Sequence, residues 1–117
     1  MKIGELANKS GLTKDTIRLY ERMDLLVDIT QPHQNNSYKE YSDKNLHRIE
    51  LIRYSQSLGF SLKECKYIAE ALENGKLTPE EKSKLIKNKL NEIDKRVEQL
   101  KNFRVLLEEA LKKTCED

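Results

Sequence analysis

The chain has 117 residues, of which 22 are Lys or Arg, 20 are Asp or Glu and 37% are hydrophobic, and its net charge is +2. This length fits one small domain with an appendage, and the balanced charge does not by itself indicate a nucleic-acid partner. No apolar run is long enough to span a bilayer, and the N-terminus lacks the apolar stretch of a signal peptide. We therefore expect a cytoplasmic protein with no membrane partner.

The first predicted elements are two short helices joined by a tight turn. Residues 2–10 carry apolar side chains at spacings of three and four, which indicates one buried helix face. Gly11 follows, where a left-handed backbone is easily adopted, and Thr13 is a good N-cap for a second helix over about residues 14–23. With Ile17 facing the first helix, this spacing is typical of a helix-turn-helix. An ordinary helical hairpin would give the same pattern.

A hairpin and two further helices are predicted next. Residues 25–29 are expected to be extended, residues 31–37 are polar and rich in turn formers, and residues 38–41 alternate as a strand should. Ser42 begins the third helix, which stops where a capping box of the Ser-x-x-Glu type, residues 61–64, opens a fourth. That fourth helix ends at an Asn-Gly pair, which is a typical C-terminal cap.

A long helix follows. Thr78 and Pro79 supply its cap and first residue, and nothing interrupts it before about Lys113, which gives roughly 50 Å of helix. Its apolar residues recur every seven positions in two sets, which is the seam of a coiled coil, interrupted at Arg104. Packing on its own domain is the alternative, but a small domain offers too little surface to cover this stripe, so we predict a homodimer. The predicted dimerisation residues are Ile86, Leu90, Ile93, Val97, Leu100, Phe103, Leu107 and Leu111.

The order of these elements predicts a mainly α-helical fold with a small hairpin wing. Residues 1–74 form a winged helix-turn-helix domain, residues 75–78 a hinge, residues 79–113 the dimerisation helix and residues 114–117 a short tail. In such a domain the second helix enters the major groove of DNA and the wing lies against the backbone.

Basic residues lie where that layout needs them. Arg18 and Arg22 project from the second helix, where they are candidates for contacts with phosphates or base edges, and Lys39 on the wing is a candidate phosphate contact.

Five short motifs, in order, resemble the MerR family of bacterial transcription regulators over residues 1 to about 72. The sequence departs from the family at two positions, because Leu19 precedes Tyr20 where the family usually has two aromatics, and Lys39 stands where the family usually has Arg. The motifs are MKIGELA at 1–7, GLT at 11–13, TIRLYE at 16–21, YKEY at 38–41 and LGFSLKE at 58–64.

The resemblance implies DNA-binding roles for the matching positions. Thr16 and Arg18 would face the groove or its flanking phosphates, and Lys63 would approach the backbone from the fourth helix. Tyr20 would donate its hydroxyl to a phosphate, with a place in the core as the alternative, whereas we expect Tyr41 in the core. The predicted DNA contacts are Thr13, Lys14, Thr16, Arg18, Tyr20, Arg22, Tyr38, Lys39 and Lys63.

The resemblance also implies a function. A homodimer with antiparallel long helices would bind a near-palindromic promoter operator, distort the DNA and have RNA polymerase as a partner. Activator and repressor remain open, as does the effector. An excisionase-like architectural protein or a protein-interaction adaptor is the alternative, but the heptad-bearing helix argues against the first and the basic wing against the second.

No enzyme, metal or cofactor is predicted. The sequence shows no convergent set of acid, base and nucleophile. Cys65 lies on the apolar side of the fourth helix, where a buried structural role is expected. Cys115 follows the long helix, where metal-sensing relatives place ligands, but a single thiol cannot complete a soft-metal site.

Overall fold

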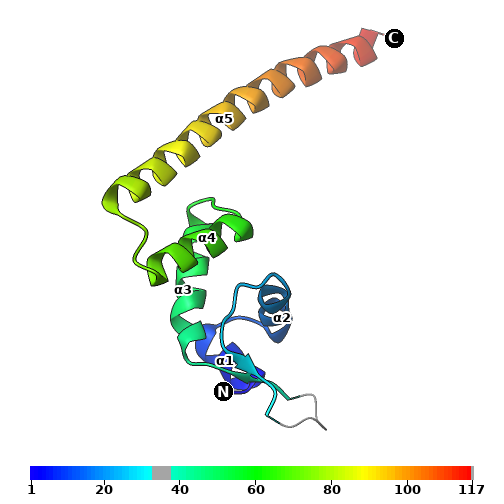
Figure 1. Cartoon of the computed structure of the whole chain (residues 1–117). Coiled ribbons are helices and arrows are strands. Elements are labelled where there is room, and N and C mark those ends of the chain that lie inside the picture. The colour runs from blue at the N-terminus through cyan, green and yellow to red at the C-terminus, as the bar shows by residue number, and fades with distance from the viewer. Residues whose placement is uncertain (33–37, 117) are drawn as a thin grey trace. The chain divides into compact units, whose positions relative to one another are not determined.

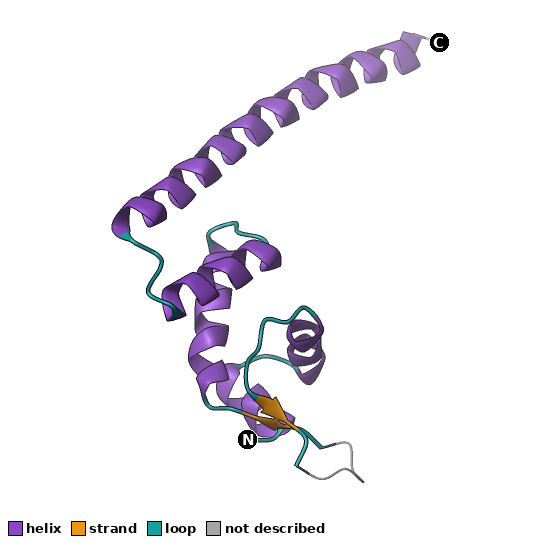
Figure 2. Ribbon diagram, in the orientation of Figure 1, coloured by secondary structure: helices purple, strands orange, loops and turns teal. Residues whose placement is uncertain are grey.

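The computed structural model describes residues 1–32 and 38–116 and divides the chain into two compact units, residues 1–77 and 78–117 (Figure 1). Figure 2 shows the predicted mainly helical fold with one small hairpin. Within the described residues no helix is long and apolar enough to cross a membrane. The elements are α1 (Ile3–Ser10), α2 (Lys14–Arg22), β1 (Ile29–Thr30), β2 (Glu40–Tyr41), α3 (Lys44–Ser57), α4 (Leu62–Glu73) and α5 (Pro79–Glu116).

The turn between α1 and α2 follows the sequence prediction. Gly11 adopts a left-handed backbone with φ +76°, and its amide donates to the carbonyl of Ala7 at 3.0 Å, which ends α1. Thr13 caps α2, because its hydroxyl oxygen accepts from the amide of Thr16 at 3.1 Å. Ile17 is fully buried, and α1 and α2 pack against each other. These two helices therefore form a helix-turn-helix.

The segment after α2 is less extended than predicted. Only Ile29 and Thr30 form a strand, although residues 25–29 were expected to be extended. The side chain of Asn45 on α3 explains this, because it donates to the carbonyl of Val27 and accepts from its amide, both at 2.9 Å. A side chain from α3 therefore satisfies backbone groups that a longer hairpin would pair across its strands.

The hairpin is small and is extended on one side by the N-terminal residue. Ile29 pairs with Tyr41 and Thr30 with Glu40 in an antiparallel ladder. The amide of Tyr41 donates to the carbonyl of Met1 at 2.7 Å, and the amino group of Met1 donates to the carbonyl of Tyr41 at 2.8 Å. The same amino group lies 3.2 Å from a carboxylate oxygen of Glu40. The predicted turn at residues 31–37 falls largely outside the described residues.

The third and fourth helices complete the first unit. α3 begins at Lys44, two residues later than predicted, and the hydroxyl of Ser42 accepts from the amide of Lys44 at 3.2 Å. The predicted capping box at the start of α4 is confirmed, with Ser61 and Glu64 each accepting from the other's amide. Cys65 is buried, as expected, and lies in the core with Ile49, Ile52 and Ile68.

The second unit is the single helix α5. The hydroxyl of Thr78 accepts from the amide of Glu81 at 3.2 Å, and Pro79 is the first helical residue. The helix has 38 residues and runs through Glu116, three residues beyond the predicted end at Lys113.

Candidate nucleic-acid interface

A stripe of basic residues runs along α2. Lys14, Arg18 and Arg22 are four residues apart, so they lie on neighbouring turns of one side of the helix, and all three are exposed. Ile17 and Tyr20 point into the core. A guanidinium nitrogen of Arg18 lies 3.1 Å from a carboxylate oxygen of Asp15, but both side chains are largely exposed, so this ion pair is weak. The helix therefore presents three cations on its outer surface.

Thr13 and Thr16, the two threonines among the predicted DNA contacts, are hydrogen-bonded to each other. The hydroxyls of Thr13 and Thr16 are 2.8 Å apart, and the Thr13 oxygen also accepts from the amide of Thr16. Thr13 is exposed and Thr16 is half-buried. These hydrogen bonds stabilise the N-terminal turn of α2 and so determine where the basic stripe begins.

A cavity lies between α2 and the wing. It has a volume of about 290 Å³. Its walls carry three cationic groups and one carboxylate. The lining residues are Ile3, Arg18, Glu21, Arg22, Lys39 and Tyr41. The structure thus brings together Arg18, Arg22 and Lys39 from the predicted set.

Glu21 is the anionic member of this cavity, and sequence reasoning assigned it no role. One of its carboxylate oxygens accepts from the hydroxyl of Tyr41 at 2.7 Å, and the other accepts from the ammonium of Lys39. Burial favours the protonated acid, but the hydrogen bonds from Lys39 and Tyr41 outweigh it and lower the pKa of Glu21. Burial and the bond to this carboxylate raise the pKa of Tyr41. Glu21 is therefore a charged link between α2 and β2.

Tyr41 and Tyr20 both belong to the core. Tyr41 is 3% exposed, as expected. Tyr20 is only 4% exposed, and its hydroxyl donates to the side-chain oxygen of Gln56 on α3 at 3.1 Å. This corrects the prediction that Tyr20 presents its hydroxyl to a phosphate, because the hydroxyl has a partner within the protein. Burial raises the pKa of Tyr20, so it remains a neutral donor at ordinary pH.

The remaining predicted residues lie outside the cavity. Tyr38 is exposed on the wing, and the ammonium of Lys2 lies 4.8 Å from the centre of its ring, in a cation–π contact. Lys63 is exposed on the first turn of α4. Lys14 begins the basic stripe on α2. None of these three predicted contacts lines the cavity.

A buried arginine, which sequence reasoning also missed, holds α2 in place. Arg48 on α3 is 2% exposed. Its Nε donates to the carbonyl of Leu25 just after α2, and its terminal nitrogens lie 2.6 Å from Glu73 and 3.5 Å from Glu70 on α4. A buried cation needs such partners. Arg48 therefore ties α3 and α4 to the segment that follows α2.

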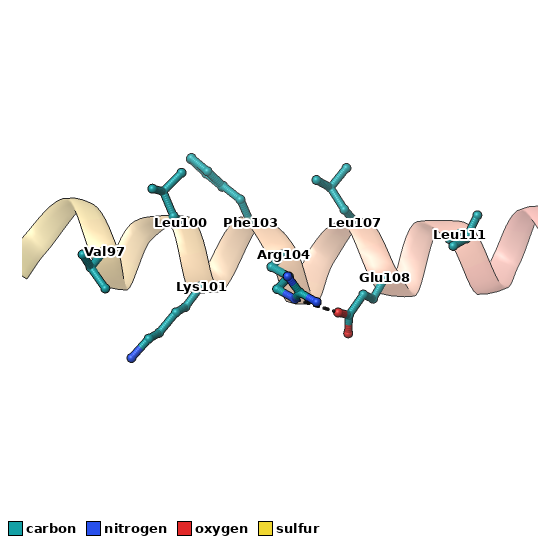
Figure 3. A pocket seen from close by; sticks show the side chains of 8 residues that line it. All are labelled: Val97, Leu100, Lys101, Phe103, Arg104, Leu107, Glu108 and Leu111. Atoms are coloured by element: carbon teal, nitrogen blue, oxygen red, sulfur yellow. Dashed lines mark hydrogen bonds and ion pairs between the residues drawn. The ribbon is translucent and has the colours of Figure 1, made fainter.

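The apolar face of α5 is uncovered. All eight predicted dimerisation residues are between 45% and 69% exposed. Figure 3 shows Leu100, Phe103 and Leu107 pointing to one side of the helix and Lys101 pointing away. These residues line a shallow groove with Arg104, whose Nε donates to a carboxylate oxygen of Glu108 at 3.1 Å. The charge that interrupts the seam is thus paired one turn further along.

Two family models match the chain. One describes a MerR HTH family regulatory protein and covers residues 1–72. The other describes MerR, DNA binding, and covers residues 46–110. Together they span α1 to most of α5, including the cavity and all of the uncovered apolar face except Leu111.

Similar proteins match most of this chain. The HTH-type transcriptional regulator HmrR of Rhizobium leguminosarum bv. viciae is 32% identical over 108 residues, which are 92% of this chain and 81% of that protein. The transcription regulator PbrR691 of Ralstonia metallidurans, solved with lead(II), has the same fold, with a TM-score of 0.77 at 22% identity over 92% of this chain and 81% of that one. HiNmlR, a MerR family regulator lacking the sensor domain and bound to promoter DNA, has a TM-score of 0.58 at 26% identity over 88% of this chain and 76% of that one.

Proposed function

The chain belongs to the MerR family of helix-turn-helix regulatory proteins and is therefore a DNA-binding transcription regulator, and we propose that it binds a near-palindromic promoter operator as an antiparallel homodimer. The observation that carries this proposal is the exposed basic stripe Lys14, Arg18 and Arg22 on the second helix of a helix-turn-helix. A helix in this position fits the major groove, and a groove-facing Arg can read a guanine edge.

The proposed protein–DNA contacts divide by chemistry. Arg18 is the base-reading residue, because it lies at the centre of the stripe and is held by Asp15 only through an exposed, weak ion pair. Lys14 and Arg22 flank it and bind phosphates. Tyr38 and Lys63 approach the backbone from the wing and from α4. Thr13 and Thr16 lie at the end of α2 that enters the groove first, where their hydroxyls are within reach of a phosphate.

The proposed dimer uses the apolar face of α5. Residues 79–113 pair with the same residues of a second copy, since eight apolar side chains that are about half exposed would be buried in a two-stranded seam. Antiparallel pairing places Arg104 of each copy away from that of the other, and Glu108 already compensates its charge. Residues 75–78 are the hinge between the DNA-binding domain, residues 1–74, and this helix.

The dimer would act on the shape of the promoter. The two α2 helices of the dimer, which are its recognition helices, would be joined by the paired α5 helices and would contact two half-sites at a fixed spacing. A protein that fits only bent or untwisted DNA would deform the promoter when it binds, and this deformation would be the regulatory signal. RNA polymerase would read the altered promoter. We propose that the protein carries out this activity in the cytoplasm.

The test begins with duplex DNA selected from a random pool by the full-length protein. Binding should weaken steeply with salt, and a footprint should cover two half-sites. Arg18→Ala should cost about 1–3 kcal/mol on the selected duplex and relax specificity at one position in each half-site.

Arg96→Ala is the matched control, because Arg96 is also an exposed helical arginine bonded to a residue three positions away, Gln99 at 2.7 Å. It should leave DNA affinity unchanged. Equal losses on selected and random duplexes would place Arg18 among the phosphate contacts. The absence of salt-dependent binding by the wild-type protein would refute the proposed function itself.

A further inference from the structure

The cavity between α2 and the wing contains a carboxylate on a surface that faces a polyanion. A carboxylate there repels DNA unless a cation neutralises it, so its presence calls for a structural explanation. The side chain of Glu21 is 22% exposed and has two partners on the wing: Tyr41 in β2 and Lys39, the residue before β2. Both oxygens of the carboxylate are used. The arrangement is that of an internal link rather than an incidental surface charge.

The wing needs such a link because its own pairing is slight. Each strand contributes two residues to the ladder, and a two-stranded hairpin is at best marginally stable alone. Met1 supports the outer edge of β2. Glu21 supports the side that faces the recognition helix, through one ionic bond and one hydrogen bond.

Building on the proposed DNA-binding function, we propose that Glu21 is a positioning residue that fixes the wing on the recognition helix, and that Lys39 acts on DNA binding through this carboxylate rather than as an independent phosphate contact. Arg18 and Arg22 are then the cations of this cavity that meet the DNA. The Glu21–Lys39 pair has no net charge and stays formed in the complex.

The net charge of the cavity differs among the variants in a way that tests this arrangement. With the pair intact, the cavity presents a net charge of two from its arginines. Removing the carboxylate alone frees the ammonium of Lys39 in each subunit to bind a phosphate and release a further counterion. Removing both charges restores the original balance. An ammonium that already binds a phosphate in the wild-type complex would behave differently, because its loss would matter whether or not Glu21 is present.

The experiment measures the salt dependence of binding for the full-length protein and four variants, using the selected duplex and a scrambled duplex of equal length. For Glu21→Gln, the slope of log affinity against log salt should steepen by about 1.8, because the dimer gains one phosphate contact in each half-site, which is about a sixtyfold change in relative affinity over a tenfold range of salt. Its preference for the selected duplex should fall, because the wing is released. The double variant Glu21→Gln with Lys39→Met should return to the wild-type slope and bind more tightly than Lys39→Met alone.

Tyr41→Phe is the matched control for the link without a change of charge. It keeps the buried ring and removes the hydroxyl that donates to Glu21, so the preference for the selected duplex should fall while the slope stays at the wild-type value. Thermal melting of each variant verifies that the domain is folded.

The proposal is overturned if Glu21→Gln has the wild-type slope and the double variant has a shallower slope than the wild-type protein, since Lys39 would then contact a phosphate directly. Failure of the underlying DNA-binding function looks different, because the wild-type protein itself would then show no salt-dependent binding.

Discussion

The two units of the chain treat their apolar residues in opposite ways. In residues 1–77, Leu6, Ile17 and Ile52 are completely buried by neighbours from the same chain. In α5, the seam residues stay between 45% and 69% exposed, with Leu107 the most exposed of them. A helix cannot bury its own apolar face. The first unit therefore buries its own apolar residues, whereas the proposed function leaves the apolar face of α5 to a second copy of the chain.

Breaking the seam is expected to have the largest effect. Ile93→Glu combined with Leu100→Glu places two carboxylates in the proposed dimer interface, each costing on the order of several kcal/mol when buried without a partner. The protein should become monomeric in sedimentation and bind a two-site duplex no better than a single half-site.

The control for the seam variant places charges on the opposite side of α5. Lys95→Glu with Asn102→Glu lies two positions further along, about 200° around the helix from the seam residues. This variant should remain a dimer. A dimer of the seam variant would show that other residues hold the two chains together.

A core substitution that creates a cavity in the first unit should have the next largest effect, and this effect is on folding rather than on dimerisation. Ile52 is completely buried, so Ile52→Ala should lower the free energy of unfolding of residues 1–77 by about 2–5 kcal/mol. Amide hydrogen exchange of residues 1–77, recorded at increasing denaturant concentration, measures this free energy of unfolding. Ile86→Ala, at a seam position 52% exposed in the single chain, should leave the exchange of residues 1–77 unchanged and instead weaken the dimer.

The two threonine caps allow a finer comparison. Thr13 caps a helix of nine residues, whereas Thr78 caps one of 38. Thr13→Ala should cost about 1 kcal/mol and should speed amide exchange through the whole of α2. Thr78→Ala should affect only the first turn of α5. Equal exchange effects along both helices would contradict the view that α2 is a short helix dependent on its cap.

The smallest effect is expected at the exposed thiol. Cys115 is exposed on α5, whereas Cys65 is 1% exposed with its sulfur 3.6 Å from the carbonyl of Ile52. An alkylating reagent should therefore modify Cys115 quickly and Cys65 only on unfolding. Within the described residues no three His, Cys, Asp or Glu side chains gather where a metal ion would fit.

Cys115→Ser should leave operator affinity and transcription unchanged with added copper, zinc or mercury, because one thiol supplies too few ligands. Tight, stoichiometric metal binding that this substitution abolished would instead make Cys115 part of a sensor site.

Local and periodic features were readable from the sequence. The order of the helices, the left-handed Gly11, the caps at Thr13 and Ser61 and the burial of Cys65 all follow from residue type and short spacing. The family was readable too, since its motifs are short and ordered. The seam of α5 is visible as a heptad repeat, because a helix converts sequence spacing into a face.

Contacts between distant residues were decided by the tertiary structure. Tyr20 is buried because α3 brings Gln56 to its hydroxyl, 36 residues away in sequence. Lys39 lies against Glu21, 18 residues away, where the wing folds back on α2.

The same reason explains the short wing and the buried arginine. Asn45 and Arg48 reach back from α3 to bond the backbone of residues 25–27, so that segment does not pair as a strand. Sequence spacing determines which side of a helix a residue occupies, but only packing determines what lies opposite that side. For this protein, the sequence therefore specified the elements and their faces, and the tertiary structure decided which charged and aromatic groups remain available to DNA.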